Sequence, residues 1–204
     1  MRGDISFTKD RYGFWRQNDP HPIAYTQEYK TRQQTTPAMA WLRLGFLFSV
    51  LSPAECSRMV ACDVGSGNGC FARTAAGCFR EMHEYDLAGN SIPSSRLEST
   101  PWDVVFLTDV LEHYLHIDDL FLIDFEYGFL SFPETPSVAS WQELVGWRHY
   151  KPDEHIWMLN EDGMRRWFSD HGYDTVASGA PEDAIRRTYI RTDRNITTMV
   201  VRRR

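Results

Sequence analysis

The sequence predicts a three-layer α/β domain built on a mostly parallel sheet. Three observations predict it: short apolar runs alternate with helix-like stretches, one run (104–107) is apolar without interruption, and a glycine-rich turn joins another run to a helix. An uninterrupted apolar run is typical of a strand buried on both faces of a parallel sheet. The 204 residues suffice for one such domain with a substantial core and are too few for two ordinary ones.

The N-terminal stretch ahead of Pro37 is polar and turn-rich without a clean period, and we expect it to form an arm or cap on the domain. A helix follows, because either of the two threonines before Pro37 can cap it and a proline suits its first turn. Apolar residues then recur at three- and four-residue steps until Ser52-Pro53 ends the helix. The chain therefore divides into an N-terminal cap with its helix over 1–52 and a core over 53–204.

The core alternates strands with helices, which favours a doubly wound sheet. Its best-defined helix begins after the cap residue Asn160, carries acids in its positive first turn and stops at Gly172. A second helix is expected over 71–80. The predicted strands are 59–62, 83–85, 103–107, 127–132, 173–177 and 196–201.

Composition and charge narrow the possible functions. With 42% hydrophobic and 14% aromatic residues, the chain has the content of a folded domain. Its 28 acidic and 22 basic residues give a net charge of −6, so nucleic acids and membrane surfaces are disfavoured as partners. The four cysteines form no Cys-x-x-Cys pair, and no apolar signal core opens the chain. We therefore expect a reduced, soluble, cytoplasmic protein with free thiols.

The most informative motif is the glycine-rich turn Asp63-Val64-Gly65-Ser66-Gly67-Asn68-Gly69, which lies between an apolar run and a helix. Glycines let the backbone turn tightly and let a ligand approach it, and the helix N-terminus adds N–H donors. A dinucleotide-binding fingerprint would need its third small residue at Cys70. The acid at 63 instead suits a ligand with an ammonium or hydroxyl donor, such as S-adenosylmethionine (SAM). Asp86, at the end of the second strand, is placed to accept both ribose hydroxyls.

With these residues, the sequence resembles the class I SAM-dependent methyltransferases. It is similar to the small-molecule-type members, whose fourth strand, here 102–108, runs into a Leu-Glu-His turn, here Leu111-Glu112-His113. The stretch 155–160 and the helix after it also resemble that family, and the likeness covers residues 55–177. The resemblance implies a Rossmann-like, seven-stranded sheet whose last strand, 196–201, is antiparallel. It also implies SAM as the cofactor. The methionine part would be lined by Asp63, Gly65, Gly67 and Gly69, the ribose by Asp86 and the adenine by Leu87. The sulfonium would be bordered by Thr108, Asp109 and Val110.

Two departures from the family pattern lie in the middle of the domain. Only about fifteen residues separate Asp86 from Trp102, so the third strand and the helix before it are abbreviated. The contact to the adenine amino group then has three candidates, Asn90, Glu98 and Ser99. The stretch 113–133 is short as well, and its helix is expected to shrink to a turn or two.

Histidines supply the candidate catalytic groups, because a hydroxyl or acidic carbon must lose a proton as it is methylated. His113 and His155 are the main candidates for a general base, with His116 as a third and Glu112 as an orienting group or alternative. Equally, Glu112 and His113 can simply shape the turn, and His155 can be a packing residue. The spacing of His113, His116, Asp118 and Asp119 permits a metal site, but acids at a helix start are more simply explained by its dipole, and we expect no metal.

A small molecule is the expected methyl acceptor. The stretch after the fourth strand, Thr108-Asp109-Val110-Leu111, lacks both the Asp/Asn-Pro-Pro-aromatic signature and the Pro-Cys signature of nucleic-acid base methylation. Aromatic residues that flank the core motifs can roof a pocket for the acceptor or can simply pack in the core: Tyr25, Tyr29, Trp41, Trp141, Trp147, Tyr150 and Trp157. Two alternatives remain, a module that binds SAM or S-adenosylhomocysteine without transfer and a nicotinamide-dependent oxidoreductase.

Overall fold

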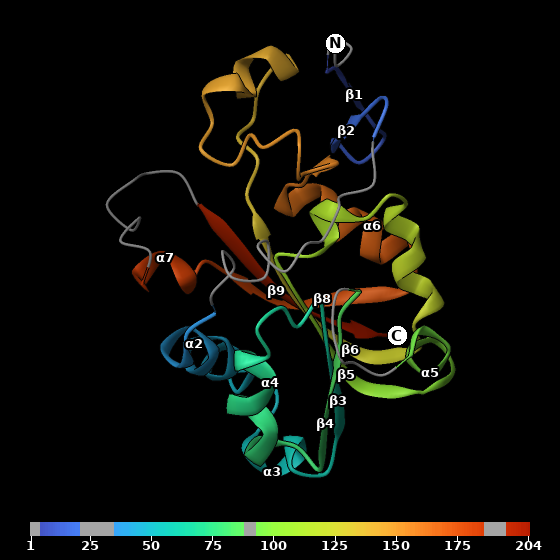
Figure 1. Ribbon diagram of the computed structural model, residues 1–204, viewed down its shortest axis with the longest axis vertical. Helices are drawn as coiled ribbons and strands as arrows, with labels where there is room; N and C mark the ends of the chain where they lie inside the picture. Colours follow the sequence, from blue (N-terminus) through green and yellow to red (C-terminus); the bar gives the residue numbers. More distant parts are fainter. Residues whose placement is uncertain (1–4, 21–34, 88–92, 186–194) are drawn as a thin grey trace.

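The computed structural model describes residues 5–20, 35–87, 93–185 and 195–204, and its centre is one six-stranded sheet (Figure 1). The strand order is β4-β3-β5-β6-β9-β8. The first four strands in this order are mutually parallel, whereas β9 is antiparallel to both of its neighbours. The mostly parallel α/β sheet with an antiparallel last strand is therefore confirmed. The strands are β3 (Val60–Val64), β4 (Glu81–Tyr85), β5 (Trp102–Thr108), β6 (Phe125–Pro133), β8 (Tyr173–Gly179) and β9 (Ile196–Arg203).

The expected seventh strand is missing from the described residues. Between β4 and β5, residues 93–101 hold only the short helix α5 (Ser94–Ser99), and residues 88–92 lie outside the described part. A crossover between parallel strands takes about a dozen residues by itself. An additional strand with its own crossover would need more chain than the nine residues 93–101, six of which belong to α5.

Helices cover both faces of the sheet (Figure 1). Successive residues of β5 face opposite sides: Val104 and Phe106 pack with one group of helices, and Val105 and Leu107 pack with the other. This is the environment that an uninterrupted apolar run predicts. One face carries α2 (Pro37–Leu47), α3 (Pro53–Cys56) and α4 (Cys70–Ala75), and the other carries α5 and α6 (Glu161–Asp170).

The helix caps agree with the sequence in two places and differ in one. The Thr36 side chain accepts the Met39 N–H at 3.3 Å, and Asn160 Oδ1 accepts the Gly163 N–H at 2.8 Å, so both predicted caps are confirmed. The predicted end of α2 is wrong, because the helix stops at Leu47. Ser52 instead caps α3 in a reciprocal capping box with Glu55.

A second, three-stranded antiparallel sheet was not predicted. It consists of β1 (Phe7–Lys9), β2 (Trp15–Gln17) and β7 (Trp157–Met158), in that order. The described part of the N-terminal segment thus pairs directly with the chain that follows His155. Strands of two or three residues carry too little periodicity to be recognised in a sequence.

The four cysteines are free, which confirms the predicted thiols. Cys62 and Cys56 are buried, and burial raises the pKa of the Cys56 thiol to about 11. Among the helices of the described residues, none has the length and apolar character needed to span a membrane.

Candidate active site

A cavity of about 470 Å³ lies at the carboxyl ends of β3, β4 and β5. Ligands of open α/β sheets bind at this edge, and the volume is that of an ordinary small-molecule pocket. No lysine or arginine belongs to the described residues that line it, whereas five carboxylate side chains do. These are Asp63, Asp86, Glu98, Asp109 and Asp119.

The glycine-rich turn forms one wall of the cavity. Gly65, Gly67 and Gly69 have φ of +75°, +55° and +66°, in the left-handed region that favours glycine. A Cβ on Gly65 would lie 2.4 Å from Val110 Cγ2, so this glycine lets the turn approach the segment after β5. A Cβ on Gly69 would meet Arg73 at 2.7 Å and Glu84 at 2.8 Å. Gly69 does not line the cavity and instead lets α4 start close to β4.

Asp86 connects the end of β4 to this turn. Its Oδ2 accepts the backbone N–H of Gly67 at 2.8 Å. The Gly65 N–H donates to the carbonyl of Tyr85 at 2.7 Å, which adds a second link between the two segments. Asp86 and the 75% exposed Leu87 both line the cavity, so the predicted ribose and adenine residues lie beside the turn.

Asp63 lies beneath the turn and is almost completely buried. Desolvation raises the pKa of its carboxyl to about 7, with Glu84 and Asp86 acting in the same direction and Arg43 opposing them. The carboxyl is therefore near its titration midpoint at neutral pH. A cationic group placed in the cavity would favour its ionised form.

A buried arginine on α2 supports the part of the wall formed by Thr108 and Asp109, and sequence reasoning gave it no role. Arg43 is 2% exposed, and its Nε donates to Glu182 Oε1 at 2.7 Å. Its Nη1 donates to Thr108 Oγ1 at 3.1 Å, and its Nη2 donates to Asp109 Oδ2 at 3.2 Å. Asp109 has φ of +56°, which is costly for a residue with a Cβ, and the ion pair compensates this strain. The only sequence signal was a charged residue inside an apolar helical run.

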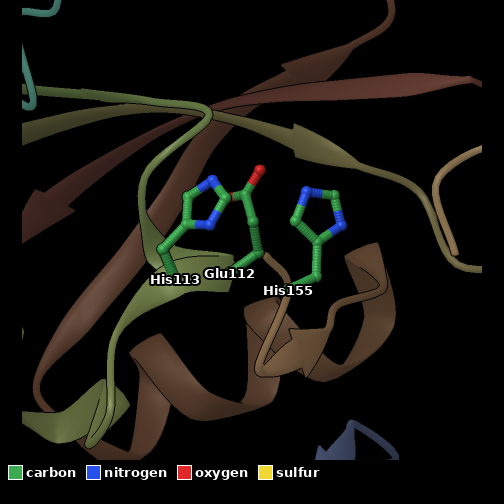
Figure 2. A group of neighbouring side chains, drawn as sticks. All are labelled: Glu112, His113 and His155. Carbon is green, nitrogen blue, oxygen red and sulfur yellow. The ribbon is translucent and has the colours of Figure 1, made fainter. Parts of the chain in front are cut away.

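Three side chains gather at another part of the wall. Glu112 and His113 belong to the 3₁₀ turn Leu111–His113, and His155 precedes β7. The Ile156 N–H donates to the Glu112 carbonyl at 2.8 Å and holds the two segments together. One possible ligand atom from each side chain lies within 4.8 Å of the other two. Figure 2 shows the Glu112 carboxylate between the two imidazole rings, whose centroids are 5.0 Å apart.

Hydrogen bonds orient both imidazole rings of this cluster. His113 Nδ1 is 2.7 Å from the Glu154 carbonyl, and His155 Nδ1 is 3.0 Å from the His149 carbonyl. A carbonyl oxygen only accepts, so each Nδ1 carries the proton of the neutral ring. Desolvation lowers the pKa of both histidines, that of His155 to about 3, which keeps the rings neutral at physiological pH.

Most of the predicted site residues border the cavity, but His155 and Gly69 do not. Of the adenine candidates, Glu98 lines it, Ser99 does not, and Asn90 lies outside the described residues. The residues that do line it, among those predicted for the cofactor or catalysis, are Asp63, Gly65, Gly67, Asp86, Leu87, Thr108, Asp109, Val110 and His113.

Two groupings that the sequence permits, a metal site that we did not expect and an aromatic roof over the pocket, are not found among the described residues. Asp118 accepts the Trp167 Nε1–H at 2.8 Å, and the possible metal ligands that cluster include neither Asp118 nor His116. Of the aromatic residues that could roof the pocket, Tyr25 and Tyr29 lie outside the described residues, and none of the others lines it. Trp41 is 55% exposed, and Trp141 packs on Phe7. Tyr85 and Tyr114 are the aromatic hydroxyl residues that do line the cavity.

Comparison with known proteins agrees with this architecture. No protein-family model and no curated protein matches the sequence. Among solved structures, magnesium protoporphyrin IX methyltransferase from Synechocystis with bound S-adenosylhomocysteine aligns with a TM-score of 0.58 at 13% identity, over 87% of this chain and 94% of that one. A SAM-dependent methyltransferase from Archaeoglobus fulgidus aligns with a TM-score of 0.58 at 13% identity, over 88% of this chain and 100% of that one. The chain therefore has the fold of the class I SAM-dependent methyltransferases.

Proposed function

We propose that this protein is a SAM-dependent methyltransferase that acts on a small-molecule acceptor in the cavity. The observation that carries the proposal is the meeting, around one cavity, of the glycine-rich turn, the carboxylate of Asp86 and the segment Thr108–Val110. Two solved methyltransferases of the same fold support it, and one of them holds S-adenosylhomocysteine. The core over 53–204 would hold the cofactor, with residues 1–52 as a cap.

Each part of SAM has a chemically suitable neighbour. In this proposal the methionine part lies along Gly65 and Gly67 above Asp63, whose carboxylate favours the ligand's ammonium and sulfonium charges. Asp86 accepts the ribose hydroxyls, and Leu87 covers the adenine. Thr108, Asp109 and Val110 border the sulfonium. Gly69 supports this arrangement by allowing α4 to begin close to β4.

The charge of the cavity suggests the class of acceptor. Five carboxylate side chains line the described wall and no lysine or arginine does, so a phosphate-bearing acceptor would be repelled. A neutral or cationic small molecule is favoured. This agrees with the net charge of −6 and with the missing signatures of nucleic-acid base methylation.

The transfer itself is an in-line displacement. A lone pair of the acceptor atom forms a bond to the methyl carbon as the carbon–sulfur bond breaks, and the bonding electrons remain on sulfur, which becomes neutral. The protein aligns the two reactants and removes a proton where the acceptor carries one. In this proposal the cluster of Glu112, His113 and His155 receives that proton, because His113 lines the cavity and the other two lie behind it.

A labelled-methyl assay tests the proposal. Purified protein is incubated with methyl-labelled SAM and fractionated extracts of metabolites, nucleic acid and protein. We expect label in the metabolite fraction, and a large loss of transfer in Asp86→Ala. Asp170→Ala is the control and should transfer normally, because Asp170 is an exposed aspartate that does not line the cavity. Label confined to nucleic acid or protein would contradict the small-molecule acceptor. Binding of S-adenosylhomocysteine without transfer to any fraction would indicate a binding module instead.

A further inference from the structure

The cluster of Glu112, His113 and His155 has the composition of a metal centre. Two imidazoles and one carboxylate come from two chain segments, and their possible ligand atoms are all within 4.8 Å of one another. Glu112 is 2% and His155 5% exposed, so the cluster is shielded from bulk water except where His113 meets the cavity. No other such group occurs in residues 5–20, 35–87, 93–185 and 195–204.

The orientation of the two rings is that of metal-ligating histidines. In such sites one ring N–H donates to a carbonyl or carboxylate, which fixes the tautomer and presents the other nitrogen to the ion. Here His113 Nδ1–H donates to the Glu154 carbonyl and His155 Nδ1–H donates to the His149 carbonyl. In both neutral rings Nε2 is therefore the nitrogen with the lone pair.

We propose that Glu112, His113 and His155 bind a divalent transition-metal ion through the two Nε2 atoms and a carboxylate oxygen. Metal–nitrogen bonds of about 2.0–2.1 Å place ligand atoms roughly 3.3 Å apart around a tetrahedral ion. The possible ligand atoms are now up to 4.8 Å apart, and side-chain shifts of about 1 Å would bring them to the distance that the ion requires. A buried carboxylate beside two imidazoles gains a compensating charge from such an ion.

The ligand set selects the kind of ion. Two imidazoles and one carboxylate suit zinc, iron and related first-row metals, whereas Mg²⁺ and Ca²⁺ prefer oxygen ligands. Three protein ligands leave at least one position for water or substrate, as catalytic sites do. His113 lines the cavity, so that position lies at the cavity wall.

The role of this ion rests on the proposed function: if the protein is a methyltransferase, the bound cation would activate the methyl acceptor. A Lewis acid lowers the pKa of a coordinated hydroxyl and so supplies the deprotonated acceptor that methyl transfer needs. In that case Glu112, His113 and His155 would hold the ion, and the proton of the coordinated hydroxyl would pass to solvent water and not to the histidines.

Metal binding by the full-length protein tests the inference without an activity measurement. After treatment with a chelator, the wild type is titrated with Co²⁺, which is followed by its visible d–d absorption, and with Zn²⁺ in competition. We expect one equivalent of Co²⁺ to bind, Zn²⁺ to displace it, and Mg²⁺ at the same concentration to leave the spectrum unchanged. A wild type that binds no stoichiometric Co²⁺ or Zn²⁺ would overturn the inference, and this measurement needs no variant.

Variants then locate the ion. Glu112→Gln and His155→Asn are expected to weaken Co²⁺ binding at least tenfold, whereas the matched changes Asp118→Asn and His116→Asn leave it unchanged. Equal binding by all four variants would show that the ion lies elsewhere, and would reject the site. If one ligand variant does not fold, the other still reports on the site.

The metal inference and the proposed function can fail separately. S-adenosylhomocysteine is titrated into the same chelator-treated wild type. Binding of the nucleoside without any metal rejects the metal site and keeps the methyltransferase proposal, with the histidines as bases. Metal binding without nucleoside binding rejects the cofactor proposal and keeps the metal site.

Discussion

Removal of the Arg43 side chain should destabilise the whole domain, because this arginine links α2 to the segment after β5 and to α7 (Glu182–Ile185). The guanidinium is 2% exposed, and Glu182, its nearest acid, is fully buried. Arg43→Met keeps the length and apolar stem of the side chain but leaves the buried carboxylate without its arginine. Removing one partner of a buried ion pair costs about 3–5 kcal/mol.

The corresponding shift in melting temperature is large enough to measure easily. For a chain of this size, 1 kcal/mol shifts the melting temperature by about 2–4 °C, so we expect a decrease of roughly 6–20 °C. Calorimetry or circular dichroism on Arg43→Met measures it, with Arg80→Met as the control. Arg80 is exposed and its nearest acid is 3.9 Å away, so its loss should change stability by less than about 0.5 kcal/mol.

A double-mutant cycle separates the ion pair from the lost packing. Glu182→Gln removes the charge that Arg43 neutralises, so Arg43→Met should cost less in that background than in the wild type. Equal costs in the two backgrounds would show that the pair has no energetic coupling. A melting temperature of Arg43→Met within about 2 °C of the wild type would refute the structural role of this arginine altogether.

Two further predictions concern the cavity. Gly65→Ala should lower the free energy of unfolding by about 1–3 kcal/mol and weaken nucleoside binding, because its Cβ would lie 2.4 Å from Val110 Cγ2 at a φ of +75°. Val110→Ala, added to this variant, should restore part of the loss. Gly45→Ala is the harmless control, because nothing lies within 4 Å of the Cβ that it adds. A double variant no better than Gly65→Ala would contradict the steric explanation. The pKa of Asp63 is raised by burial from 3.8 to about 7 in the folded protein, so its contribution to the free energy of unfolding is complete below pH 3.8 and is lost as the pH rises through 7. Urea unfolding should therefore show the wild type losing stability relative to Asp63→Asn between pH 5 and pH 8, and a constant difference would reject the raised pKa.

The parts of the site that the sequence could predict are those that follow from local pattern and parallel-sheet geometry. The buried strands β3 and β5 are short apolar runs, and the glycine turn lies directly after the first of them. Since the carboxyl ends of parallel strands meet at one edge of a sheet, Asp86 was expected beside that turn, and its bond to the Gly67 N–H places it there.

The remaining parts depend on contacts between distant segments. Arg43 and Glu182 are 139 residues apart, and neither has a local pattern that names the other. His155 lies near His113 because β7 pairs with β2 and because the Ile156 N–H donates to the Glu112 carbonyl. The sequence could not show this, because a strand of two residues has no recognisable period. The only sign in the sequence that the described residues would hold six strands in this sheet and not seven was the short distance between Asp86 and Trp102.

A calorimetric titration of the wild type with S-adenosylhomocysteine, compared with NAD, tests directly whether the cavity binds the methyltransferase cofactor. We predict one nucleoside bound per chain, no measurable binding of NAD, and an affinity about 10- to 150-fold lower in Asp86→Ala, the loss expected for a charged hydrogen bond worth about 1.5–3 kcal/mol. Asp86→Asn, which keeps an acceptor for the Gly67 N–H, separates the ribose contact from the turn. Binding of NAD but not of S-adenosylhomocysteine would contradict the proposed cofactor, and an affinity unchanged in Asp86→Ala would contradict the ribose contact.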